Sequence, residues 1–364
     1  MKHGDVVQPL DGTTMRRVAG NAKSAAEVIV RSCVNHLFSL LDDSGRFVYA
    51  HKHLAPDQTG EGYNLLRHCG TVWFMCKAIH TLSIDLSGRE KRALMAAVLY
   101  IRARTKAPPW HTGPSPALCV TARDAVKLGN VGLAALMIRG YAQLASETDT
   151  ASLASLYPEG FDLHCTSLEN YIISQLKEGS FVHKRVFSTG EIRQFESDYY
   201  TGEALFALMQ SSRHIPRVRV AMEQMLHDGY GLAQQSHWMA YAACASLRVD
   251  YCDRALTTTY VGRLIDRIAS DESYRYRQES TPIACRTEAL VEILRTCRQN
   301  TYLNQRLPKA AIDKAATIAA ENLALQLKYY GDGQFRRGRV SDQVRIDYIQ
   351  HNGAAFLGWW QLLH

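Results

Sequence analysis

The chain has 364 residues, 46% of them hydrophobic and 21% charged, an ordinary globular composition that excludes a disordered or low-complexity protein. Its apolar runs are broken by Arg, Lys or His before they reach the length of a membrane span, so we expect no membrane partner. The net charge of +7 is dispersed along the chain, which disfavours nucleic acid as a partner. The charge suits a cleft for an anionic substrate, although a basic surface without that role explains it equally well.

The N-terminal sequence MKHGDVVQPLDGTTMRR has no apolar stretch and no small-residue cleavage site, so we expect a cytoplasmic protein with residues 1–20 as a peripheral segment. The nine cysteines agree with a reducing compartment, since their number is odd and no CxxC pair occurs. We expect buried free thiols. The length suits a single closed domain over residues 1–364.

Six segments carry an apolar stripe opposed by charged residues at the 3.6-residue period, which predicts helices with one exposed face. They lie at residues 22–42, 89–104, 162–177, 215–228, 253–269 and 309–329. Between them lie segments that are apolar almost all round and rich in small residues, which predicts helices packed on every side. These begin at Tyr63, Val126, Tyr200, Ser236, Cys285 and Tyr348. The alternation predicts six helical hairpins closed into a double ring, an all-α (α/α)6 toroid.

Three of the exposed helices run into similar turns, each with an acidic residue and a glycine followed by an aromatic residue, at residues 43–47, 178–181 and 332–335. The sequences FVYAHK and FVHKRVF after two of these turns predict short strands. Connections from exposed to buried helices are long, whereas most of the return connections are short. We therefore expect short β-hairpins in long loops at one end of the toroid, and this end is the predicted working face.

Unusual polar residues gather where the buried helices begin. In the first of these helices, Tyr63, Arg67 and His68 are spaced so that they can share one face. A buried arginine without a partner costs several kcal/mol. Arg67 is therefore expected either to hold a carboxylate of the protein or to bind one on a ligand.

The third buried helix begins with the sequence SDYYTGEALFAL. Asp198 and Glu203 flank its first turn, together with Tyr199, and Gly202 leaves room for close approach of another element. Asp198 has a residue type that favours an N-cap. Glu203 precedes an unbroken apolar run on a helix with little exposed surface, which favours a site role over a solvated one.

The fourth buried helix begins with His237, and the sixth carries Arg345, Asp347 and His351. Asp347 and His351 are four residues apart, close enough in a helix for the carboxylate to orient the imidazole as a general base. A single histidine on an apolar helix is more often a satisfied core residue. Three of them, His68, His237 and His351, at equivalent helix starts favour a functional site.

Two further positions have open interpretations. In the fifth buried helix, Arg286 and Glu288 either pair with each other or with a neighbouring helix, or Arg286 binds a substrate carboxylate. Trp110, in the loop APPWHTGPSP, either roofs the cavity as a platform for a sugar ring or packs its own loop.

The sequence has no P-loop, no GxGxxG after a strand, no HExxH, no GxSxG and no cysteine and histidine spacing typical of zinc. We therefore expect neither a metal nor a nucleotide cofactor.

In its succession of hairpins and in the stretches YNLLRHCGT, DYYTGEALFAL, QSHWMAYAA and RIDYIQH, the chain resembles the six-hairpin (α/α)6 toroids. These include N-acylglucosamine 2-epimerase-like isomerases, glucuronyl C5-epimerase-like proteins and unsaturated glucuronyl hydrolases. The resemblance covers nearly the whole chain and implies the fold rather than one reaction. For the epimerase branch it implies paired histidines as acid and base, matched by His237 and His351. For the hydrolase branch it implies an inner-ring carboxylate, for which Asp198, Glu203 or Asp347 would serve.

We expect a sugar epimerase, an isomerase or a glycoside hydrolase that acts on an acidic sugar or oligosaccharide by acid and base chemistry. In this hypothesis His237, His351 and Glu203 move protons, and Arg67, Arg286 or Arg345 binds the substrate carboxylate. The alternative is a non-catalytic toroid that binds a peptide or polymer, or that supports a partner enzyme of a biosynthetic pathway.

Overall fold

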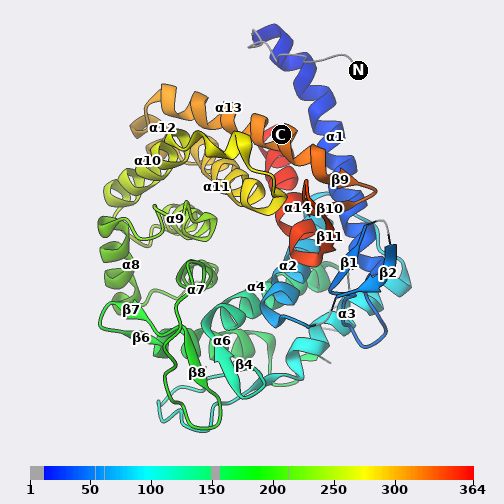
Figure 1. Ribbon diagram of the computed structural model, residues 1–364. Helices are drawn as coiled ribbons and strands as arrows, with labels where there is room; N and C mark the ends of the chain where they lie inside the picture. The colour runs from blue at the N-terminus through cyan, green and yellow to red at the C-terminus, as the bar shows by residue number, and fades with distance from the viewer. Residues whose placement is uncertain (1–11, 54, 61, 149–155, 212) are drawn as a thin grey trace.

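The computed structural model describes residues 12–53, 55–60, 62–148, 156–211 and 213–364. Figure 1 looks down a ring of helices. The first helix, α1 (Gly12–Ser39), begins ten residues before the predicted start at residue 22, and its N-terminal part extends away from the ring. Of the segment predicted to be peripheral, residues 1–11 lie outside the described residues.

Six helices form the inner ring, and each contacts the next. They are α2 (Leu65–Thr81), α4 (Leu128–Thr148), α7 (Tyr200–Met209), α9 (His237–Val249), α11 (Ser280–Gln299) and α14 (Ile346–Leu362). Contact between α14 and α2 closes the ring. The fifth of these helices begins five residues before the predicted Cys285, because Pro282 lies in its first turn, where a missing N–H is tolerated.

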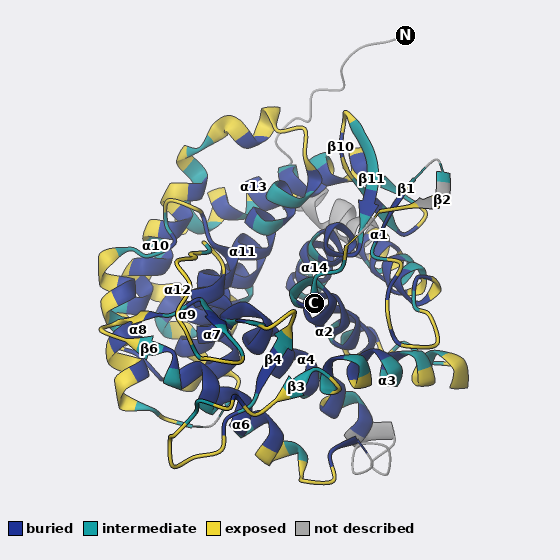
Figure 2. Ribbon diagram, turned by 60° about the horizontal axis from the view of Figure 1, so that its bottom comes forward, coloured by how far each residue is buried: buried dark blue, intermediate teal, exposed yellow. Residues whose placement is uncertain are grey.

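Six outer helices surround this ring, and Figure 2 shows their exposed residues on the side away from the inner helices. They are α1, α3 (Gly88–Arg102), α6 (Phe161–Ser174), α8 (Pro216–Asp228), α10 (Arg254–Ser270) and α13 (Lys309–Gln326). Short helical segments complete the described part, namely α12 (Thr301–Arg306), η1 (Glu272–Tyr276) and η2 (Leu327–Tyr329). The predicted all-α toroid of six hairpins is confirmed. In the described residues, no helix is long and apolar enough to cross a bilayer.

Short strands occupy the long loops, as predicted. The first sheet has the order β2-β1-β11-β10-β9. Its strands are β1 (Ala50–Lys52), β2 (Ala55–Thr59), β9 (Tyr330–Gly331), β10 (Gln334–Gly338) and β11 (Ser341–Arg345). In this sheet Ala50 pairs with Arg345 and Lys52 with Gln343 in an antiparallel register, so the sheet joins the loop after α1 to the loop before α14.

A second sheet, with the order β3-β4-β5-β8, joins the second and third long loops. Its strands are β3 (Thr105–Lys106), β4 (Cys119–Ala122), β5 (Ala125–Lys127) and β8 (Lys184–Val186), and a hairpin of β6 (Leu176–Lys177) and β7 (Ser180–Phe181) lies nearby in the chain. The predicted start of the second inner helix at Val126 therefore belongs to β5, because that segment pairs with β8 before the helix begins.

The three predicted turns contain glycines with nearly the same backbone conformation. Gly45, Gly179 and Gly333 have φ values of +80°, +80° and +78°, a region that L side chains rarely adopt. At Gly45 a Cβ atom would collide with the backbone of Ala96 in α3, and at Gly333 it would collide with the backbone of Ser32 in α1. Two of these turns therefore pack directly on the following outer helix around the ring.

Aromatic rings fill the middle of the inner ring and form a plug of Trp73, Phe206, Trp238 and Tyr241. The ring centroids of Trp73 and Trp238 are 5.8 Å apart, and those of Phe206 and Tyr241 are 5.1 Å apart. Trp238 lines a cavity at the end where the inner helices begin, whereas the other three rings line a cavity at the opposite end. The plug therefore lies between two separate cavities.

Gly202 generates a test of the inner-ring packing. A Cβ atom there would lie 2.7 Å from Cβ of Trp238 and 3.0 Å from the backbone nitrogen of Met239, so Gly202→Ala forces α7 and α9 apart. We expect a loss of about 1–3 kcal/mol in the free energy of unfolding, measured by urea denaturation. Gly262→Ala in α10 is the control, because its Cβ would meet Leu307 at an ordinary 3.4 Å, and it should raise stability by up to about 1 kcal/mol. A fully stable Gly202→Ala protein would contradict the packing described.

Candidate active site

A cavity of about 700 Å³, here called the main cavity, lies at the end of the toroid where the inner helices begin. Side chains from the first turns of α7, α9, α11 and α14 line it, together with Arg67 of α2 and residues of the long loops. Of the residues predicted from the sequence, the lining includes Arg67, Tyr199, Glu203, His237, Arg286, Arg345, Asp347 and His351. The predicted working end therefore has a cavity that brings most of the predicted residues together.

His351 is held by a carboxylate from another helix. Its Nδ1 lies 2.8 Å from Oε1 of Glu288 in α11, and Tyr241 donates a hydrogen bond of 2.9 Å to the other oxygen of Glu288. Burial by itself lowers the pKa of His351, but Cys285 and Glu288 beside the ring raise that pKa well above its usual value. The contact with Glu288 therefore favours the protonated form of His351.

The predicted pairing of Asp347 with His351 is wrong. The Asp347 carboxylate instead forms an ion pair with Nε of Arg67 at 3.0 Å and accepts a hydrogen bond from Nη2 of Arg345 at 2.9 Å. Helical spacing brings Asp347 near His351, but two guanidinium groups compete for the carboxylate and offer stronger charge-assisted hydrogen bonds. Arg67 thus has a carboxylate of the protein as its partner, one of the two alternatives predicted for it.

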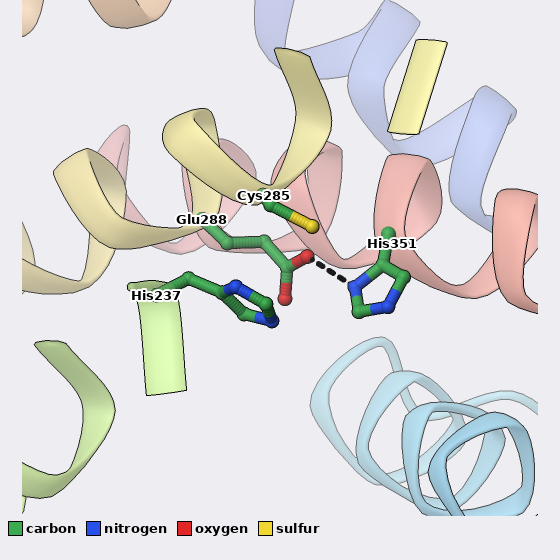
Figure 3. A group of neighbouring side chains, drawn as sticks. All are labelled: His237, Cys285, Glu288 and His351. Atoms are coloured by element: carbon green, nitrogen blue, oxygen red, sulfur yellow. Dashed lines mark hydrogen bonds and ion pairs between the residues drawn. The ribbon is translucent and has the colours of Figure 1, made fainter. Parts of the chain in front are cut away.

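His237, the first residue of α9, is a buried neutral histidine. Ser236 caps the helix by accepting a hydrogen bond from the backbone nitrogen of Met239, and this cap places the His237 ring at the cavity. Within the described residues, Nε2 of His237 has no hydrogen-bond partner. Burial and the charge of His351 lower the pKa of His237 well below its usual value. The two rings have centroids 5.2 Å apart, so two imidazoles whose pKa values are shifted in opposite directions face one space (Figure 3).

Glu203 is a buried carboxyl group in the wall of the main cavity. Burial raises its pKa to about 8, while the charge of His351 acts against that shift. In the described structure its Oε2 has no hydrogen-bond partner, and Gly129 of α4 leaves it room, since a side chain at Gly129 would collide with Oε2. Glu203 is therefore a neutral acid at pH 7, able to donate a proton or a hydrogen bond.

Four side chains at this site have atoms that bind metals. His237, Cys285, Glu288 and His351 each offer one ligand atom, and these atoms lie within 4.8 Å of one another (Figure 3). Imidazole, thiolate and carboxylate are ligands that zinc accepts. A metal would have to replace the proton between His351 and Glu288, because ligand nitrogens must be unprotonated. The group as it stands fits proton transfer, and the absence of a metal requirement stays a prediction.

Four predicted site residues do not line the main cavity. Nε2 of His68 donates a hydrogen bond of 2.9 Å to the carbonyl oxygen of Ala97, and Nδ1 lies 2.7 Å from the Tyr63 hydroxyl, so His68 faces α3 and not the lumen. Tyr63 is held there by His68 and by the backbone nitrogen of Phe47. The interpretation of His68 as a satisfied core residue is the one that these contacts favour.

Trp110 and Asp198 also lie elsewhere. Trp110 donates a hydrogen bond of 2.9 Å to the carbonyl oxygen of Phe187 and packs against Gly190, so it joins its own loop to the loop before α7. Asp198 is exposed just before α7, where Tyr199 rather than Asp198 occupies the N-cap position. Neither residue lines the main cavity.

Arg286 binds the C-terminal end of α10 and the residue that follows it. It contacts the carbonyl oxygen of Ile268 at 2.8 Å and the Asp271 carboxylate at 3.3 Å. Of the alternatives left open, pairing with a neighbouring helix is therefore the one observed, and Glu288 is free to hold His351. Glu288 lies three residues after Cys285, so the two side chains share one face of a buried helix. This spacing is the sequence signal that would have identified Glu288.

Positive charge surrounds the mouth of the main cavity. Arg67 and Arg345 share Asp347, Arg286 pairs with Asp271, and Arg337 pairs with Glu279 at 3.2 Å; the lining also contains Arg267 and Arg277. Within the described residues, Arg267 and Arg277 form no ion pair. Neither was predicted from the sequence, because Arg267 lies in the last turn of an outer helix and Arg277 lies in a loop without a pattern. The N-terminal ends of inner helices add positive partial charge at this end.

Comparison with known proteins identifies the fold. The sequence matches no family model and no curated protein. The structure is similar to that of a D-mannose isomerase, with 12% sequence identity, a TM-score of 0.60, and coverage of 92% of this chain and 97% of that chain. This likeness covers the whole ring and confirms the expected toroid at the level of the fold.

Two further solved structures match over a similar length. One is the alpha-1,6-mannanase GH76A from Salegentibacter sp. HEL1_6, at 9% identity and a TM-score of 0.41, covering 93% of this chain and all of that one. The other is a possible member of the GH105 family from Salmonella enterica, at 11% identity and a TM-score of 0.38, covering 94% of each chain.

The protonation of Glu203 can be measured through stability. Its folded pKa of about 8 lies above the ordinary value of 4.5, so its contribution to stability is complete below about pH 4.5 and is lost as the pH rises towards 8. Compared with Glu203→Gln, the wild-type protein should therefore lose stability between pH 5 and 8, on the order of 1 kcal/mol per pH unit. Urea denaturation across this range measures the difference. The same substitution at exposed Glu191 is the control, and parallel curves for wild type and Glu203→Gln would show an ionised Glu203.

Proposed function

We propose that the protein is a sugar isomerase or epimerase that moves a proton at the carbon beside the sugar carbonyl group. The observation that carries this proposal is the pair of imidazoles in the main cavity, whose environments shift their pKa values in opposite directions. Two titratable groups whose pKa values are pushed apart next to one space are suited to act as base and acid. The similarity in fold to a D-mannose isomerase supports a sugar as the substrate.

In this mechanism neutral His237 removes the proton from the carbon beside the carbonyl group, and protonated His351 donates a proton to the carbonyl oxygen. The product of these two transfers is an enediol. In isomerisation, His237 gives its proton to the former carbonyl carbon while neutral His351 removes the proton of the other enediol hydroxyl group. In epimerisation, His351 takes back the proton of the former carbonyl oxygen and donates it to the original carbon from the opposite face, and His237 loses the abstracted proton to solvent. Glu288 stabilises the charged form of His351 before the transfer, and Tyr241 holds Glu288 in place.

We propose further that the substrate carries a negative charge. Arg267 and Arg277 line the main cavity and form no ion pair within the described residues, so their guanidinium groups are available to a carboxylate or phosphate. The helix N-termini at this end favour the same sign of charge. They would also stabilise the negative charge that develops on the carbonyl oxygen during enolisation.

Glycoside hydrolysis is the second candidate, because Glu203 has the raised pKa of a general acid. That reaction needs a second carboxyl group as base or nucleophile. Asp347 is neutralised by Arg67 and Arg345, and Glu288 is engaged by Tyr241 and His351. Proton transfer by the two histidines therefore fits the described contacts better.

The histidine mechanism predicts that His237→Asn and His351→Asn each lower kcat by roughly 10²- to 10⁴-fold, because each removes one proton-transfer group. Neutral and acidic sugars, including uronic acids and amino sugars, would be incubated with the protein in D₂O. Deuterium at the carbon beside the carbonyl group, detected by NMR, is the expected result for the wild-type protein and should be lost in both variants.

His227→Asn is the matched control, since His227 is exposed on the outer helix α8 and does not line the main cavity. Cleavage of a glycoside without deuterium uptake would identify a hydrolase instead. Full activity of a folded His237→Asn, His351→Asn double variant would rule out the proposed mechanism, and a toroid that responds to no sugar would fit the non-catalytic alternative.

The proposed anionic substrate gives a separate prediction. Arg277→Gln should raise KM for an acidic sugar roughly tenfold, through loss of a charge-assisted hydrogen bond, and should leave kcat nearly unchanged. KM for the corresponding neutral sugar should not change. Arg89→Gln, on the exposed start of α3, is the control for loss of one positive charge from the molecule. Equal changes of KM for acidic and neutral sugars would contradict a charge-specific role.

A further inference from the structure

A second cavity of about 260 Å³, here called the distal cavity, lies at the end of the toroid where the inner helices finish. Residues late in α2, α7, α9 and α11 line it, and its floor is the side of the aromatic plug formed by Trp73, Phe206 and Tyr241. The distal cavity therefore lies on the other side of the plug from His237 and His351. The proposed reaction does not use it.

The distal cavity contains more positive than negative charge. Lys77, Arg248 and Arg295 line it, and Glu292 is the carboxylate among its lining residues. Arg248 and Arg295 each donate to one oxygen of Glu292, both at 2.7 Å. Burial raises the pKa of Glu292, but Arg248, Arg295 and Lys77 lower it to about 2, so Glu292 stays ionised. Among the lining residues, the negative charge of Glu292 therefore balances one of three positive charges, and about two positive charges remain.

Lys77 contacts two aromatic rings of the plug but has no hydrogen-bond acceptor within the described residues. Its ammonium group lies 5.4 Å from the ring centroid of Trp73 and 5.6 Å from that of Tyr241. Within the described residues it has no hydrogen-bond acceptor, although an ammonium group has three donors. Burial and the charge of Arg295 lower the pKa of Lys77 to about 8. A half-buried ammonium group beside two arginines is costly unless an acceptor joins it.

The negative ends of the inner helices do not account for this cluster. Helix C-termini favour nearby cations, usually through their last carbonyl oxygens. Arg248 instead donates to Glu292 and to Oγ1 of Thr296 at 3.1 Å, and Arg295 donates to Glu292. The described contacts of both guanidinium groups are therefore with side chains, and each has further N–H donors.

We propose that the distal cavity binds a small oxyanion of the phosphate class, held by Lys77, Arg248 and Arg295. A tetrahedral oxyanion has several acceptor oxygens, so it can receive the Lys77 ammonium donors and the remaining guanidinium donors at once. Its charge would offset the excess that Glu292 leaves. Free phosphate and the phosphate group of a monoester share this chemistry, and the experiment distinguishes them.

The test measures binding to the full-length protein by calorimetry, with inorganic phosphate or methyl phosphate as the ligand and chloride holding the ionic strength constant. Lys77→Gln should weaken phosphate binding roughly tenfold or more, because it removes one charge-assisted contact. Lys77→Arg, which keeps the charge, should retain most of the affinity. Arg248 and Arg295 are left intact, since removing either would leave the buried Glu292 short of a partner.

A second measurement reports on the site itself and needs no variant. Acetic anhydride acetylates lysines, and mass spectrometry follows the extent of reaction at Lys77. Phosphate should slow acetylation of Lys77 several-fold relative to chloride, whereas exposed Lys309 at the start of α13 should react equally in both. Protection by methyl phosphate as well would assign the cavity to phosphate esters, and protection by inorganic phosphate alone would assign it to the free ion.

The proposal is overturned if phosphate leaves acetylation of Lys77 unchanged, or if folded Lys77→Gln binds phosphate as well as the wild-type protein does. Either result would mean that any bound phosphate lies in the main cavity or on the surface. Both readouts are independent of sugar turnover, so an inactive protein that still shows protection of Lys77 would count against the proposed function alone.

Discussion

All six inner helices of the ring begin at the same end, and most of the remaining structure depends on this constraint. Each outer helix returns the chain to that end, so the long connections and their short strands collect there. The first turns of the inner helices meet around one cavity, and their N–H groups give it positive partial charge. The opposite end receives the helix C-termini and a separate group of cations. The toroid is thus chemically different at its two ends.

Much of this polarity was predictable from the sequence because it depends on spacing within single helices. Periodicity separates exposed from buried helices, and the polar residues at the starts of the buried ones point to the working end. His237 is an example: Ser236 before it is a strong N-cap, and the apolar run after it marks an inner helix. The positions of Arg67, Glu203, Asp347 and His351 at the main cavity follow from the same reasoning.

Contacts between helices were not predictable in this way. Asp347 and His351 satisfy the i, i+4 spacing, yet Arg67 and Arg345 take the carboxylate, and Glu288 from α11 holds the imidazole. Arg67 and His68 are adjacent in α2, yet Arg67 lines the main cavity and His68 faces α3. Successive side chains of an α-helix point about 100° apart, so the rotation of a helix about its axis decides which side chain faces the cavity. The sequence alone does not reveal that rotation.

The seam of the ring has a consequence for how the protein is made. The ring closes where α14 contacts α2 and where β1 pairs with β11, so residues near the beginning of the chain meet residues near its end. Arg67 pairs with Asp347 across this seam, and His237 faces His351 across the ring, so both contacts need α14. During synthesis, the earlier hairpins must therefore wait as an open arc with apolar inner faces until α14 has left the ribosome. A chain interrupted before that point would carry five stacked hairpins and His237 without His351.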